Sequence, residues 1–233
     1  MAFLILPTQS TIQMIQKITL GFLKDIKLNN SKVWFDANKK RYDDARTAFI
    51  TSVEEMIVAI GSLDPDINNL TAKECIFRIN RDVRFSKDKR PYKNNMAAYF
   101  NRAGKKGTGA GYYVHIEPGQ SFIAAGVWMP EGEGLSKIRQ EIDYNFDDWK
   151  KIIGNISFKK QFQKGIDKSN SLVRTPKGYD ENNPVLEFLK LKSFVAMKQI
   201  SDTELKSKTF IGDLTKSFKA VKPLIDFINR SLD

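Results

Sequence analysis

The chain has one cysteine and one histidine among 233 residues, and this scarcity excludes several classes of protein. A single Cys75 cannot build the disulfide framework that stabilises small secreted domains. Cys75 and His115 cannot by themselves supply the ligands of a Cys/His zinc site. We therefore predict no metal site, and a chain of this length can bury a sizeable core without such staples.

Long apolar runs are also missing. Residues 2–6 are apolar, but the run is too short for a signal peptide and no charged segment precedes it. No stretch approaches the roughly 20 apolar residues of a membrane-spanning helix. These absences favour a cytoplasmic protein with no membrane partner.

Positive charge is abundant and unevenly placed. The chain has 38 Lys and Arg against 27 Asp and Glu, a formal charge of +11. Residues 74–107 contain ten cationic and three acidic residues, and residues 151–178 contain seven cationic residues and one acidic residue. A basic excess favours anionic partners. The second block is mostly lysine and fits a solvated surface equally well, whereas the first is rich in arginine, whose planar guanidinium suits phosphate and carboxylate.

The hydrophobic pattern predicts an α+β fold, in which an antiparallel β-sheet is packed with helices and both terminal segments are helical. We expect a single domain over residues 1–233. Its predicted parts are a helical segment 8–62, a sheet core 74–130, mixed helices and short strands 131–205, and a C-terminal helix 207–230.

Several strands are predicted from alternating side chains. Residues 112–117 and 121–129 form a hairpin with a turn at Pro118-Gly119. Residues 74–85 alternate in the same way, with charged side chains on one face. We also predict short strands at 156–162, 171–174 and 194–200 and a short helix at 184–190. Pro223 is expected to kink or divide the last helix.

The most distinctive segment is 78–93, where seven of sixteen residues are cationic and two are acidic. In an extended strand Arg78, Asp82 and Arg84 share one face, so the carboxylate can hold both guanidiniums and leave donors free for an anion. An ion-pair lattice that covers the sheet is the alternative. We predict an anion site whose ligand-binding residues are Arg78, Arg81, Arg84, Asp88, Lys89 and Lys93.

Three residues are candidates for proton transfer at this site: Tyr92, Asp82 and His115. Tyr92 has cationic neighbours in sequence, which favour a phenolate. His115 is the only imidazole, and it shares a strand face with Tyr113 and Glu117; a histidine with a structural role in the sheet is the alternative. The glycine-rich loop 104–111 fits neither a P-loop nor a dinucleotide fingerprint, and no cofactor is indicated.

The segment 78–93 reads RxxRDxRFxxDKxPYK, and it resembles the signature of conserved hypothetical bacterial and fungal proteins called domain of unknown function family 2461. Other pieces agree with the resemblance, which covers nearly the whole chain: Asn29-Asn30 with Trp34-Phe35, Gly111-Tyr112-Tyr113, Gly126-x-Trp128-x-Pro130 and Pro176-Lys177-Gly178-Tyr179. The resemblance implies a single intracellular α+β domain and implies no activity.

Two ligand-binding functions fit these observations, and an interaction scaffold with no ligand is a third interpretation. The first is an Arg/Lys-rich pocket that binds a small phosphorylated or carboxylated ligand, with or without turnover. The alternative is weak, non-specific binding of nucleic acid by basic surfaces 78–106 and 151–177. Asp82 and Asp88, interleaved with the cations, would repel a phosphate backbone but would orient arginines around a discrete ligand, so the first is favoured. The sequence leaves the ligand, the reaction and the oligomeric state undetermined.

Overall fold

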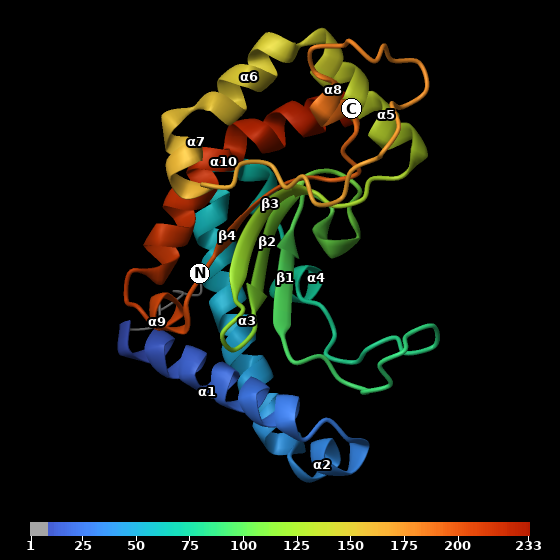
Figure 1. The fold of residues 1–233 in the computed structure, drawn as a ribbon. Helices are drawn as coiled ribbons and strands as arrows, with labels where there is room; N and C mark the ends of the chain where they lie inside the picture. The colour runs from blue at the N-terminus through green and yellow to red at the C-terminus, as the bar shows by residue number, and fades with distance from the viewer. Residues whose placement is uncertain (1–8) are drawn as a thin grey trace.

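A computed structural model describes residues 9–233, and the side chains of the first helix from residue 17 onward. The predicted start of the helical segment at residue 8 therefore lies outside the described residues. The helices α1 (Gln9–Leu28) and α3 (Lys39–Gly61) pack against each other (Figure 1). The short helix α2 (Lys32–Ala37) lies between them in the sequence and is found at the end of the pair. The Ser31 side chain caps α2, and Asn38 separates α2 from α3, so the described part of the predicted helical segment 8–62 contains three α-helices.

The centre of the fold is a four-stranded antiparallel sheet in the order β1-β2-β3-β4. Its strands are β1 (Met96–Phe100), β2 (Gly111–Ile116), β3 (Phe122–Val127) and β4 (Phe194–Gln199). The strands predicted at 112–117, 121–129 and 194–200 are confirmed, as is the α+β class. β1 was not predicted.

The two faces of the sheet differ. Tyr112, Val114 and Ile116 of β2 are buried on the face that α3 and the C-terminal helix α10 (Phe210–Leu232) cover. The ring of Tyr112 packs on Phe218 of α10 with centroids 4.9 Å apart. Figure 1 shows α3 passing behind the sheet. Tyr113 and His115 alternate with the buried residues, so they project from the opposite face, which we call the open face.

The strand predicted at 74–85 is wrong. A capping box of Thr71 and Glu74 starts a short helix α4 (Ala72–Cys75), so the chain enters this region as a helical turn. After α4 only isolated bridges form, Ile76 with Ala98 and Asn80 with Tyr92. Between those last two residues the chain leaves the sheet as a projecting loop (Figure 1), which we call the arginine loop, residues 80–92.

The region 131–205 is more helical than predicted. The strand expected at 156–162 is instead helix α7 (Ile156–Gln161), because the Asn155 side chain accepts hydrogen bonds from the first amides of that turn. Residues 171–174 contribute a single bridge from Ser171 to Leu191. The other helices here are α5 (Gly132–Tyr144), α6 (Phe146–Gly154), α8 (Leu186–Leu189) and α9 (Asp202–Leu205), with 3₁₀ turns η1 (Pro65–Ile67) and η2 (Gly104–Lys106) elsewhere.

Two further features concern α10 and Cys75. Pro223 lies inside α10, which runs through it undivided. Cys75 is fully buried at the end of α4, and burial raises the pKa of its thiol to about 11. Over residues 9–233 the structure has no helix with the length and apolar character needed to cross a membrane.

Candidate functional site

The base of the arginine loop is held by backbone and amide hydrogen bonds. The amide of Arg81 donates to the carbonyl of Pro91 at 2.9 Å, and the amide of Lys93 donates to the carbonyl of Ile79 at 2.8 Å. Asn30 adds a contact from the turn after α1. Its amide nitrogen donates to the Tyr92 carbonyl at 3.0 Å, and its oxygen accepts from the Tyr92 amide at 3.1 Å. The loop is therefore ordered at its base although it leaves the sheet.

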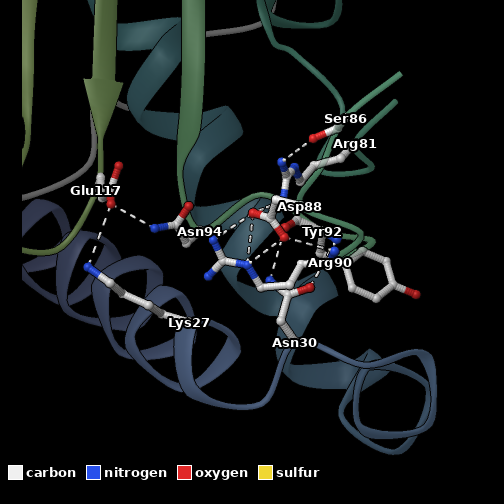
Figure 2. A network of polar contacts seen from close by, with 9 residues as sticks. All are labelled: Lys27, Asn30, Arg81, Ser86, Asp88, Arg90, Tyr92, Asn94 and Glu117. Atoms are coloured by element: carbon white, nitrogen blue, oxygen red, sulfur yellow. Dashed lines mark hydrogen bonds and ion pairs between the residues drawn. The ribbon is translucent and has the colours of Figure 1, made fainter. Parts of the chain in front are cut away.

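Asp88 is the centre of the ion pairs within the loop. Its Oδ2 accepts from Nη1 of Arg81 at 2.6 Å and from Nη2 of Arg90 at 2.7 Å (Figure 2). Hydrogen bonds from Arg90, followed by those from Arg81, hold the pKa of this carboxyl well below its usual range. Ser86 accepts a weaker bond from Arg81 at 3.4 Å. Asp88 thus closes the loop on itself.

Asp82 does not hold two arginines, contrary to the expectation from a strand face. It pairs with Arg84, whose Nε and Nη2 donate to its two oxygens at 3.0 and 2.7 Å. Both side chains are exposed, and hydrogen bonds from Arg84 lower the pKa of Asp82. Lys89 donates to the Val83 carbonyl at 3.0 Å. These cations are therefore used within the loop itself.

Tyr92 has a packing role. It is buried, and its ring stacks on Phe35 of α2 with centroids 4.1 Å apart and planes 15° apart. Among the described residues no hydrogen bond or ion pair joins Tyr92, Asp82 and His115, so the structure does not assemble the three predicted proton-transfer groups into one cluster.

Arg78 forms none of the salt bridges of the loop, and it lines a pocket of about 470 Å³ that we call the basic pocket. The cationic side chains that line it come from α3, from α4 and the segment after it, and from η2: Arg46, Lys73, Arg78, Lys105 and Lys106. Tyr42, Phe49 and Met96 contribute to its apolar wall. No Asp or Glu is among the described residues that line it, and none of its five cations takes part in a salt bridge within the described chain.

Lys93 connects this region to the open face of the sheet. Its ammonium lies 5.7 Å from the ring centroid of Phe77, which also lines the basic pocket. Burial, followed by repulsion from Arg78, lowers the pKa of Lys93. An anion in the basic pocket would relieve that repulsion.

A chain of three polar side chains runs along the open face of β2, and we call it the Tyr-His-Glu relay. Nε2 of His115 lies 3.2 Å from Oε2 of Glu117, and Nδ1 lies 3.0 Å from the hydroxyl of Tyr113. A carboxylate only accepts, so the proton of neutral His115 is on Nε2 and the Tyr113 hydroxyl donates to Nδ1. Glu117 is itself held by Asn94 at 2.7 Å and by Lys27 at 3.7 Å (Figure 2).

Burial sets the protonation states of this relay. It lowers the pKa of His115 against the opposing effect of Glu117, so the imidazole is neutral at pH 7. Burial raises the pKa of Tyr113 to about 12. A neutral imidazole beside a protonated phenol can take up the phenolic proton when the hydroxyl reacts. The sequence placed the three residues on one face, but only the structure shows that they contact one another.

The open face also carries the larger of the two cavities, about 820 Å³, which we call the aromatic cleft. Its aromatic lining is Phe77, Tyr99, Tyr113, Phe122 and Trp128, and Ala124 and Gly126 are part of its floor. Phe77 and Lys105 line both this cleft and the basic pocket, so the two cavities adjoin. Within residues 9–233 no group of His, Cys, Asp and Glu side chains is placed to hold a metal ion.

Comparison with known proteins decides the family. The model of the family described as conserved hypothetical protein (DUF2461) matches residues 18–227. The chain belongs to this family. The match confirms the family that the sequence resembles, and it spans the arginine loop, the basic pocket and the Tyr-His-Glu relay. Searches of the curated proteins and of the solved structures found no match.

Proposed function

We propose that the basic pocket binds a small phosphorylated or carboxylated ligand. The observation that carries the proposal is the convergence of five cations on one pocket whose described lining includes no carboxylate. Asp82 near Arg78 and Glu74 near Lys105 offset part of this charge from outside the lining. The five cations still outnumber these carboxylates and repel one another, and a bound anion removes that cost. Arg78 is the predicted ligand-binding residue that the proposal keeps in the pocket. The proposal gives the other predicted residues of the loop a structural role: they hold the arginine loop in its conformation through contacts within it. These residues are Arg81, Arg84, Asp88 and Lys89.

Thermal-shift titration with inorganic phosphate or sulfate tests this proposal. At ten times the dissociation constant an anion stabilises the folded state by about 1.4 kcal/mol, which raises the Tm of a chain of this size by about 3–6 °C. Arg78→Ala and Lys105→Ala should each reduce the shift.

Arg84→Ala is the matched control, because it removes an arginine of the same segment that is already paired with Asp82. It should leave the anion-dependent shift unchanged. No stabilisation of the unmutated protein at tens of millimolar phosphate or sulfate would refute the proposal. An equal loss in Arg84→Ala and Arg78→Ala would move the site from the pocket to the loop.

Proton transfer, in this proposal, is assigned to Tyr113 in place of Tyr92. The Tyr113 hydroxyl lies beside His115 and its ring lines the aromatic cleft, whereas the Tyr92 ring is stacked on Phe35. Phe77, whose ring centroid is 6.3 Å from that of Tyr113, separates this hydroxyl from the basic pocket. A ligand anchored in the pocket and extending past Phe77 would bring a reacting group toward Tyr113.

A further inference from the structure

The backbone of the sheet excludes side chains at two positions that line the aromatic cleft. Gly126 has a φ of +130°, and a Cβ on it would lie 1.9 Å from the carbonyl oxygen of Phe194. A Cβ on Gly111, the residue paired with Gly126 across the sheet, would lie 2.4 Å from the carbonyl oxygen of Phe100. Neither position tolerates a side chain. The Tyr99 ring lies on Gly111, with its Cζ 2.9 Å from that Cβ position, and its hydroxyl lies 3.4 Å from the carbonyl oxygen of Gly126. The part of the floor left without a large side chain is therefore Ala124–Gly126, beside Tyr99, a surface suited to a planar ring.

The rim of the cleft holds an aromatic side chain in solvent. Trp128 is 63% exposed, although a tryptophan at the end of a buried strand would ordinarily pack inward. The next residue, Met129, has a φ of +48°, the one positive value at a non-glycine residue in the described chain. Its amide donates to the Ser193 hydroxyl at 3.0 Å, which helps to hold this conformation. Strained backbone of this kind occurs most often at functional sites.

Charge gives the cleft a direction. The end that it shares with the basic pocket carries Lys105, and Arg78 and Lys73 lie beyond it. Other parts of the lining include Glu131 and Glu133, and Glu133 pairs with Lys137 at 3.3 Å. A ligand with one anionic end therefore has a single favourable orientation, with its charge toward the basic pocket and its uncharged body over the floor of the cleft.

We propose that the aromatic cleft and the basic pocket form one composite site for an anionic aromatic compound, a ring system joined to a phosphate or carboxylate. The acid group lies among the basic pocket's cations, and the ring lies on the Ala124–Gly126 floor between Tyr99 and Trp128. The cleft volume of about 820 Å³ is ample for such a body. The inference rests on the proposed function, to which it adds the class of ligand.

Isothermal titration calorimetry with three probes tests the inference: inorganic phosphate, 1-naphthyl phosphate and neutral 1-naphthol. Naphthyl phosphate should bind at least tenfold more tightly than phosphate. Trp128→Ala should remove most of that gain and leave phosphate affinity unchanged, and Arg78→Ala should weaken both anions. Phe85→Ala, which removes a 95% exposed ring outside the cleft, is the matched control and should change none of the affinities.

The two proposals fail in different ways. If phosphate binds and naphthyl phosphate binds no more tightly, the composite site is refuted while the basic pocket stands. If naphthol binds as well as naphthyl phosphate and Arg78→Ala has no effect, the cleft is separate from the pocket and the inference is again overturned. If neither anion binds, both proposals fall. A change of oligomeric state in Trp128→Ala on size-exclusion chromatography would make the cleft a contact between copies and overturn the inference.

Discussion

At the scale of single residues, Asn30 shows how a side chain from outside the arginine loop fixes it in place. Its amide group meets both backbone polar groups of Tyr92, as a neighbouring strand would. The sequence marked Tyr92 as a chemical candidate from the cations around it. Its contacts with Asn30 and Phe35 span more than fifty residues of chain, so no local pattern could reveal that its ring is a packing anchor.

Replacing Asn30 with alanine should therefore loosen the attachment of the loop. We expect Asn30→Ala to lower the free energy of unfolding by about 1–3 kcal/mol, because two backbone groups lose their partner in a half-buried place. Urea denaturation measures the loss. Asn29→Ala is the control, since Asn29 is exposed and its side chain donates only to the Asp25 carbonyl, and it should change stability by no more than about 0.5 kcal/mol. Equal effects would contradict the assigned role.

His115 predicts a dependence of stability on pH. Burial lowers its pKa in the folded state below the value of about 6.5 in the unfolded chain, so the unfolded state binds more protons near pH 6. Stability should therefore fall as the pH falls below about 6.5. His115→Gln cannot titrate there and should show a flatter profile in urea melts between pH 7.5 and 5.5. Parallel profiles for the two proteins would show that His115 titrates normally.

At the scale of elements, the fold follows the sequence where one face of an element is buried and the other is not. β2 and α10 have clean apolar stripes, and both were predicted. β1 was missed because Met96, Ala97 and Ala98 are all buried, so its pattern does not alternate. Segment 74–85 alternates but has no partner strand along most of its length, and its charges pair within the loop instead. Alternation indicates a strand only where a neighbour is available.

The candidate site divides in the same way. Tyr113, His115 and Glu117 stand two residues apart on one strand, so their shared face could be predicted from spacing. The basic pocket could not, because Arg46, Lys73 and Lys105 come from segments that meet only in the folded chain. Arg78 was predicted as a ligand-binding residue because it belongs to the cationic segment 78–93. The other cations of its pocket are outside that segment, although Lys93 and Asp82 within the segment also interact with it electrostatically.

The arginine loop gives a test of which carboxylate orders it. Asp88→Asn should speed proteolytic cleavage within residues 80–92, because it weakens the ion pairs to Arg81 and Arg90 that close the loop. Asp82→Asn is the matched control, since Asp82 pairs with Arg84, two residues away, and joins no distant parts of the loop. Limited proteolysis with mass spectrometry locates the cuts. Faster cutting in Asp82→Asn than in Asp88→Asn would reverse the roles assigned here.

At the scale of the whole molecule, the position of the charge matters more than its sum. Figure 1 places α7, which belongs to the second basic block, and the arginine loop, which belongs to the first, on opposite sides of the sheet. Helices cover one face of that sheet, the aromatic cleft lies on the open face, and the basic pocket lies beside the β1 edge, between α3 and η2. A discrete ligand can use this arrangement, whereas a nucleic acid strand would have to pass around the molecule to meet both blocks.

Binding to nucleic acid should accordingly be weak and strongly dependent on salt. If one block contacts about three phosphates, a plot of log affinity against log salt has a slope of about −2.7. Fluorescence anisotropy with a labelled duplex, repeated for unrelated sequences, measures it. Charge reversal at Lys159 and Lys160 should lower this binding without changing the phosphate titration of the basic pocket. Tight, sequence-selective binding at about 0.2 M salt would favour nucleic acid as the ligand.

The burial of Cys75 makes the protein a ready host for spectroscopic probes. With a pKa of about 11, its thiol is about one part in a thousand thiolate at pH 8, and it has no exposed surface for a maleimide or nitroxide reagent to reach. A cysteine placed at position 85 or 128 would thus carry the label selectively in an otherwise unmodified chain. Spin labels at those two sites would report, by their separation and mobility, how the tip of the arginine loop and the rim of the cleft respond when an anion is added.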